Sequence, residues 1–292
     1  MPVEKIEVVP LICEIAVWMI FGTGVICCLF LPFQSHLRKG QPLLPALGML
    51  QARPFTFAHA LPVIALTGLF ALMAAFQASG DGTNITPAGC LLGVSICAGA
   101  GFFTIALCTL MTQKGFRAVF GSAGGCTWQA AIGKGVLYGF AAIPVVTLVS
   151  FAVLEIGNRL GLDMDSQDVF TWLQDPTFSI SVRAALIFFA VVVAPISEEL
   201  LFRGILLPAL MKGRDFAFAA LLCSFYFALI HLHGPSLLSL MTLGIMFSAG
   251  YAATGSILTP IVMHTVFNLN GVLLFFFNTN PTTSWLHFGT ML

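Results

Sequence analysis

The chain has 292 residues, of which 58% are hydrophobic and only 8% carry a charge, and its formal net charge is zero. A soluble domain usually contains about 25% charged residues. This composition therefore excludes a water-soluble fold and makes the lipid bilayer the solvent for most of the chain. The balanced charge, without any long basic run, also argues against nucleic-acid binding.

The apolar segments predict about eight spans of the ~20 residues that a membrane helix needs. They occupy residues 9–33, 57–78, 88–111, 132–155, 182–211, 216–232, 236–253 and 257–277. The first follows Lys5 and is longer than the apolar part of a signal peptide, so we interpret it as a retained helix. The predicted fold class is an all-α, polytopic bundle of transmembrane helices.

Basic residues gather in alternate loops between these spans, namely Arg38, Lys39 and Arg53, then Lys114, Arg117 and Lys134, then Lys212 and Arg214. The positive-inside rule places such loops on the cytoplasmic side. We therefore expect an integral, multi-pass protein of the plasma or inner membrane.

Small and soft residues inside the apolar segments indicate packing rather than chemistry. The eight cysteines include no pair with the C-x-x-C spacing of a metal site, and they are typical of soft hydrophobic filling. In the fourth span, Gly135 and Gly139 are four positions apart, which is typical of a close approach between two helices.

Ionisable residues inside spans are costly and indicate functional sites. The fifth span contains Glu198, Glu199 and Arg203, preceded by Pro195. Glu199 and Arg203 are four apart, so they share a helix face and can pair, whereas Glu198 lies about 100° around the helix. One carboxylate is then neutralised and the other is left to face a cavity. Pro195 can kink the helix and free a backbone carbonyl.

Two further polar segments lie in the late spans. The sixth carries Phe227 and His231, and the eighth carries His264 and Asn268. His264 and Asn268 share one face and could donate hydrogen bonds to an oxyanion or ligate a metal. Taken singly, each group has a structural interpretation, as an ion pair, an interfacial histidine or a contact between helices. Taken together, they favour a functional site.

The three motifs, in order, resemble the CPBP family of intramembrane proteases. They are E-E-x-x-x-R at residues 198–203, F-x-x-x-H at 227–231 and H-x-x-x-N at 264–268. This family includes the CAAX prenyl endopeptidases and the bacteriocin-processing or self-immunity proteins. The resemblance covers residues 182–277, which we expect to be a catalytic core. Residues 1–181 would form N-terminal helices of unassigned role, and 278–292 a short tail.

The resemblance implies a role for each reacting residue. Glu198 resembles the family's general base, which activates a water, and His231 resembles the partner that helps to hold that water. His264 and Asn268 resemble the groups that stabilise the oxyanion of the tetrahedral intermediate. A carboxylate in a low-dielectric cavity is a useful base near neutral pH, which agrees with this assignment.

Other polar residues near the motifs receive lesser roles. Glu199 and Arg203 are implied to orient the site rather than to react. His233 and Asn270 do not match the spacing of the motifs and are expected to lie outside the reacting set.

A metal is the open question of this resemblance. If zinc is present, Glu198, His231 and His264 would be its ligands. Asn268 is a poor zinc ligand and suits hydrogen bonding better, so the residues favour a reaction without a metal cofactor.

The expected partners are a membrane protein or peptide substrate and the lipid bilayer. A second hypothesis is a non-catalytic membrane scaffold or a transporter with a buried Glu/His proton site. Transporters tend to show internal repeats and broken helices in both halves. Here the polar residues are confined to the second half, which favours an intramembrane endopeptidase.

Overall fold

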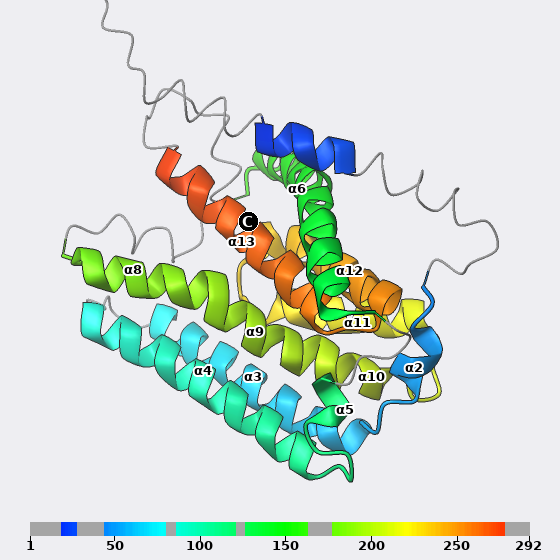
Figure 1. Cartoon of the computed structure of the whole chain (residues 1–292). Helices are drawn as coiled ribbons and strands as arrows, with labels where there is room; N and C mark the ends of the chain where they lie inside the picture. Colours follow the sequence, from blue (N-terminus) through cyan, green and yellow to red (C-terminus); the bar gives the residue numbers. More distant parts are fainter. Residues whose placement is uncertain (1–18, 28–43, 80–85, 121–125, 163–176, 278–292) are drawn as a thin grey trace, which may run out of the picture.

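The computed structural model describes residues 19–27, 44–79, 86–120, 126–162 and 177–277. All regular structure among these residues is helical (Figure 1). Residues 19–27 are helical. The further elements outside the long central helix are α2 (Leu47–Gln51), α3 (Phe57–Ser79), α4 (Pro87–Leu110), α5 (Arg117–Phe120), α6 (Trp128–Arg159), α11 (Phe216–Leu229), η3 (Gly234–Ser236), α12 (Leu237–Thr254) and α13 (Leu258–Phe277). The predicted all-α fold is confirmed.

The central element is one continuous helix from residue 180 to residue 210, predicted from the sequence as 182–211. It consists of α8 (Ile180–Phe188), η1 (Phe189–Val193), α9 (Ala194–Glu199), η2 (Leu200–Leu206) and α10 (Leu207–Leu210). The segments η1 and η2 are π-helical, so the helix is wound more loosely on either side of α9. Such π segments are rare and occur frequently at functional sites.

The membrane-spanning character of the described helices is clear from their length and composition. Four are long and apolar enough to cross a bilayer, and they cover Pro87–Leu110, Trp128–Arg159, Ile180–Leu210 and Gly234–Thr254. Three shorter apolar stretches cover Phe57–Met73, Phe216–Leu229 and Leu258–Leu274. The chain is therefore an integral membrane protein. Of the predicted first span, only residues 19–27 are described, and they are helical.

Capping residues explain where four of the described helices begin and where one of them ends. Thr86, Thr127, Ser179 and Asp215 each accept a hydrogen bond from a backbone N–H in the first turn of the helix that follows. Gly255 ends α12 in the left-handed conformation, with φ of +70°, which favours glycine. The cap at Thr127 makes α6 begin four residues before the predicted start of the fourth span.

The close helix approach predicted at Gly135 and Gly139 is confirmed. A Cβ atom on Gly135 would lie 2.7 Å from the Cβ of Val262, and one on Gly139 would lie 2.9 Å from the Cβ of Val266. Both valines belong to α13. The two glycines therefore let α6 pack directly against the helix that carries His264.

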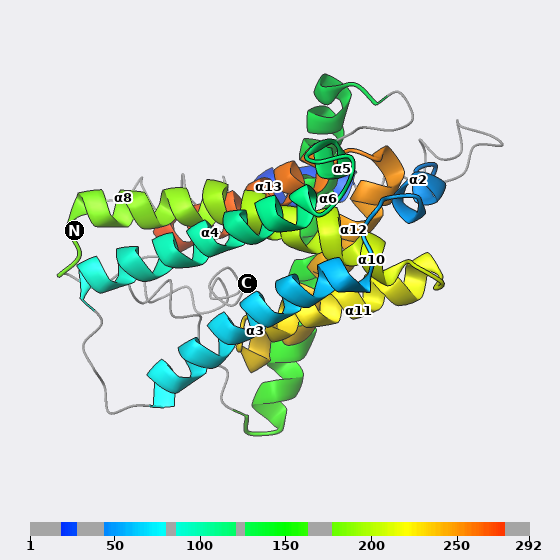
Figure 2. The same cartoon turned by 90° about the horizontal axis from the view of Figure 1, so that it is seen from below.

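The central helix lies between α4 on one side and α13 on the other, as two perpendicular views indicate (Figures 1 and 2). Helices α11 and α12 pack against each other, and α12 also packs on α6 and α13. The main apolar cluster surrounds η2, where Phe202, Ile205 and Leu206 are fully or almost fully buried. This arrangement turns one face of α9 and η2 toward α11, α12 and α13.

Three of the basic loops lie at the same end of the bundle. The Nζ of Lys212 donates a hydrogen bond of 2.7 Å to the carbonyl of Gln51. The Arg53 guanidinium, which is buried, donates to the carbonyls of Arg117 and Ala118. The three basic loops therefore lie on one side of the membrane, as the sequence predicts. That this side is cytoplasmic stays a prediction.

Candidate active site

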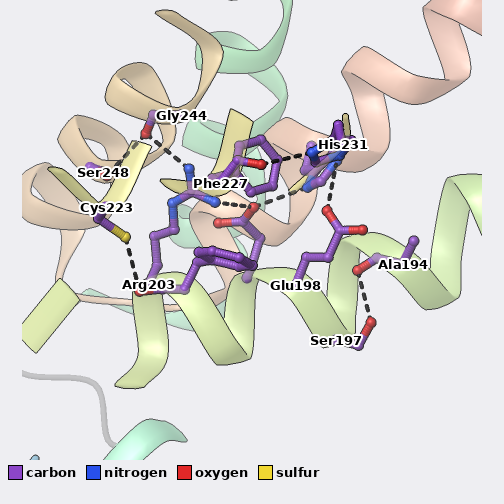
Figure 3. A network of polar contacts seen from close by, with 12 residues as sticks. Ala194, Ser197, Glu198, Arg203, Cys223, Phe227, His231, Gly244 and Ser248 are labelled. Atoms are coloured by element: carbon purple, nitrogen blue, oxygen red, sulfur yellow. Dashed lines mark hydrogen bonds and ion pairs between the residues drawn. The ribbon is translucent and has the colours of Figure 1, made fainter. Parts of the chain in front are cut away.

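The fold brings the three motifs together around one buried ion pair. The Nη1 of Arg203 donates a hydrogen bond of 2.8 Å to the Oε1 of Glu199, and both side chains are 0% exposed. Figure 3 shows Glu198 and Arg203 rising from the same helix toward Phe227 and His231. A buried charge of this kind is tolerated only when it is paired and hydrogen-bonded.

The guanidinium of Arg203 is held from two further sides. Its Nη2 donates a hydrogen bond of 3.0 Å to the carbonyl of Gly244 in α12. Its Cζ lies 4.6 Å from the ring centre of Phe227 and 5.2 Å from that of Phe247, which are cation–π distances. A Cβ on Gly244 would come 3.0 Å from Nη2, so glycine is what gives the guanidinium room.

His264 lies between the two glutamates. Its Nδ1 is 3.0 Å from the Oε1 of Glu199, and its Nε2 is 4.0 Å from the Oε2 of Glu198. An ionised carboxylate only accepts hydrogen bonds, so Nδ1 carries the proton and donates. The ring stacks on Phe247, with centroids 4.9 Å apart and planes at 29°, and meets Phe227 edge-on. These contacts fix the plane of the imidazole.

The two adjacent carboxylates differ in exposure as their helical spacing predicts. The side chain of Glu198 is 26% exposed, whereas that of Glu199 is 0% exposed. Glu199 is bound by both Arg203 and His264, while Glu198 keeps an accessible carboxylate beside the Nε2 of His264. The accessible carboxylate of the site is therefore Glu198.

His231 lies in the turn that follows α11, because the helix ends at Leu229 and not at residue 232 as the sequence suggested. Its Nδ1 is 2.7 Å from the carbonyl oxygen of Phe227. A carbonyl cannot donate, so Nδ1 carries the proton, and in the neutral ring Nε2 is left as an acceptor. Leu232 adopts φ of +52°, a strained value for leucine, which turns the chain sharply after the exposed His231.

Asn268 lies one turn along α13 from His264 and is half-buried. Its Nδ2 donates a hydrogen bond of 2.8 Å to the carbonyl of Ala190 in η1. The residues outside the motif spacing have other contacts. The Nδ1 of His233 lies 2.5 Å from the Oγ of Ser236 and caps η3, and Asn270 is buried.

The arrangement of possible metal-binding side chains was the open question of the sequence resemblance. Among the described residues, no group of three or more His, Cys, Asp or Glu side chains is arranged to hold a metal ion. The binding of zinc by Glu198, His231 and His264 stays a prediction.

Two contributors to the site lie outside every motif. Gly244 and Phe247 both belong to α12, which sequence reasoning left without a role. The spacing of Gly244 and Ser248 is that of a close helix approach, which signals tight packing but does not name the partner. Phe247 is one apolar residue among many, and no pattern in the sequence distinguishes it.

The stretch that contains the three motifs is similar in sequence to known proteins. Residues 180–270 match the family described as Type II CAAX prenyl endopeptidase Rce1-like. Over 83 residues the chain is 36% identical to the Bacillus subtilis (strain 168) protein named "Putative membrane peptidase YdiL". That alignment covers 28% of this chain and 34% of the relative, so the chain spans about a third of the length of the relative it matches. No solved structure matches the chain.

The match covers every residue of the three motifs and overlaps most of residues 182–277, over which the sequence predicts the resemblance. A relation to the bacteriocin-processing proteins stays a prediction. The resemblance to the CAAX proteases is confirmed: over residues 180–270 this membrane protein is similar to the Rce1-like family of type II CAAX prenyl endopeptidases.

Proposed function

We propose that this chain is an intramembrane endopeptidase in which Glu198 activates water for attack on a peptide bond. The observation that carries the proposal is the position of His264 between a fully buried glutamate and a partly exposed one. Glu199 orients the imidazole, and Glu198 is free to take a proton. Two carboxylates in different environments, joined by one histidine, suit acid–base chemistry better than structural support alone.

The first step is attack by water. The Glu198 carboxylate accepts one proton from a water molecule, and the acceptor Nε2 of His231 holds the second hydrogen. The oxygen of this water then forms a bond with the carbonyl carbon of the scissile peptide, whose oxygen becomes an oxyanion. General-base catalysis by a positioned carboxylate contributes about 10²–10⁴-fold to the rate.

The second step stabilises the intermediate and breaks the bond. In the imidazolium form, His264 donates from Nδ1 to Glu199 and from Nε2 to the oxyanion at once. Glu198 is protonated at this stage, so the negative charges of Glu199 and the oxyanion are balanced by the positive charges of Arg203 and the His264 imidazolium. The carbon–nitrogen bond then breaks, and Glu198 returns its proton to the leaving amine. The Nδ2 of Asn268 has a second N–H for the same oxyanion.

The substrate we propose is a peptide segment anchored in the bilayer. The site lies among apolar helices, so a membrane-bound substrate reaches it without entering bulk water. The name of the matching family points to a prenylated carboxyl-terminal segment as the first substrate to test.

The test is cleavage by purified protein in nanodiscs. Two internally quenched peptides serve as probes: a CAAX-type peptide with a prenylated cysteine, and an unmodified transmembrane peptide. We expect cleavage of at least one, detected by fluorescence and located by mass spectrometry, and no cleavage by the Glu198→Ala variant. Equal cleavage by wild type and Glu198→Ala would reject Glu198 as the base. Cleavage by neither protein would count against an endopeptidase and favour a scaffold or a proton-coupled transporter.

A further inference from the structure

The π-helical segment η1 leaves one backbone carbonyl without its helical partner. In η1 the N–H of Ala194 bonds to the carbonyl of Phe189, five residues back. In that register the next carbonyl, that of Ala190, would receive the N–H of residue 195. That residue is Pro195, which has no N–H. The α-helical partner of Ala190 would be Ala194, whose N–H is already bound to Phe189.

Asn268 fills this vacancy. Its Nδ2 lies 2.8 Å from the carbonyl oxygen of Ala190, across the gap between α13 and the central helix. An unpaired backbone carbonyl in an apolar environment costs free energy. The hydrogen bond from the Nδ2 of Asn268 removes this cost and therefore holds the side chain in place. The sequence indicates that Pro195 can free a backbone carbonyl. The π-helical register identifies this carbonyl as the one of Ala190.

The hydrogen bond also fixes which way the Asn268 amide faces. If the amide flipped by 180°, its Oδ1 would meet the carbonyl oxygen of Ala190, and two acceptors would repel each other. The NH₂ group is therefore held toward the central helix. One of its two hydrogens binds Ala190, and the other remains for a second acceptor.

We propose that Pro195 is a positioning residue, which frees the Ala190 carbonyl so that this carbonyl orients Asn268 as an oxyanion donor. This inference rests on the proposed function. Pro195 precedes the glutamate pair in the central helix, and its effect is on Asn268, which belongs to α13. A proline that only shaped the central helix would act on all parts of the site alike and would have no special coupling to Asn268.

The test compares Pro195→Ala with Asn268→Ala and with the double variant. Alanine at 195 supplies the missing N–H, so the Ala190 carbonyl no longer needs Asn268. We expect kcat to fall about 10-fold, less than the 10²–10³ lost when an oxyanion donor is removed outright. KM should change little. In the Asn268→Ala background, Pro195→Ala should change kcat by less than about twofold, because its effect passes through Asn268.

Pro62→Ala is the matched control, because Pro62 also lies inside a helix but in α3, outside the site. It should keep the wild-type kcat. The inference is overturned if Pro195→Ala keeps the wild-type kcat. It is also overturned if the two substitutions lower kcat independently in the double variant, or if Pro62→Ala lowers kcat as much as Pro195→Ala does.

A second readout does not need activity. The side-chain amide of Asn268, labelled with ¹⁵N and assigned by its loss in Asn268→Ala, should show distinct, slowly exchanging protons in the wild type. In Pro195→Ala these protons should shift and exchange faster, and in Pro62→Ala they should not. An unchanged amide signal in Pro195→Ala sinks the inference whether or not the protein cleaves peptides. Absent cleavage with the expected amide shift would reject only the proposed function.

Discussion

His264 and Glu199 are joined by a buried hydrogen bond of 3.0 Å although 65 positions separate them in the chain. The same Oε1 of Glu199 also accepts from Arg203 at 2.8 Å, so one oxygen links the imidazole to the guanidinium. The two motifs that contribute these residues therefore form a single unit. Changing any member of this unit is expected to affect both the stability of the bundle and the orientation of His264.

The first prediction concerns the buried charges. Arg203→Met and Glu199→Gln should each lower the free energy of unfolding by about 3–5 kcal/mol, because each leaves a buried charge without its ion-pair partner across one helical turn. The double variant Glu199→Gln/Arg203→Met should lose less than the sum of the two. Unfolding in detergent, followed by intrinsic fluorescence, measures the three values. Strict additivity would show that the pair is not coupled.

The second prediction uses the two nitrogens of His231. Glutamine places a polar atom near the position of Nε2, and asparagine places one near Nδ1. If Nε2 is the group that holds water, His231→Gln should retain more activity than His231→Asn, and His231→Ala should lose about 10²–10⁴-fold in kcat. All three should fold, since His231 is exposed. The reverse order of Gln and Asn would assign the functional nitrogen to Nδ1.

The third prediction tests the role of α12. In Gly244→Ala the new Cβ would lie 2.8 Å from the Cβ of Ser224 and 3.0 Å from the Nη2 of Arg203. We expect a loss of about 1–3 kcal/mol in stability from overpacking, together with lower activity. Gly133→Ala is the control, because nothing lies within 4 Å of its new Cβ, and it should be neutral or slightly stabilising. Similar losses in both variants would contradict a specific role for Gly244.

The sequence predicted the parts of this molecule that hydropathy and spacing determine. The helices at 57–79, 87–110 and 180–210 lie within about two residues of the predicted spans, because apolar length and Gly or Pro punctuation define them. The pairing of Glu199 with Arg203 followed from their separation by four residues. The small residues Gly135 and Gly139 predict a close approach to another helix, and the structure identifies that helix as α13.

The remainder depends on contacts between helices that the sequence leaves open. Phe247 stacks on His264 because α12 packs between α6, α11 and α13, and no pattern within α12 indicates that neighbour. The partner of Asn268 depends on a π register that hydropathy does not predict. His231 was placed inside a helix because the apolar run continues past Leu229, where the helix ends.

The fourth prediction concerns metal removal. The proposed mechanism uses only side chains of this chain, so prolonged dialysis against a strong chelator such as phenanthroline should leave the cleavage rate unchanged. The control is the same sample after addition of Zn²⁺, which should also show no change. Loss of activity on chelation and its recovery with Zn²⁺ would instead identify Glu198, His231 and His264 as metal ligands.

The central claim is that Glu198 is the base, and kcat of the Glu198→Gln variant tests it most directly. Glutamine preserves the shape of the side chain and its hydrogen bonds but cannot accept the proton of the attacking water. We predict a fall in kcat of about 10²–10⁴-fold, with KM and the unfolding midpoint close to those of the wild type. A Glu198→Gln protein that cleaves the same peptide at the wild-type rate would contradict the account.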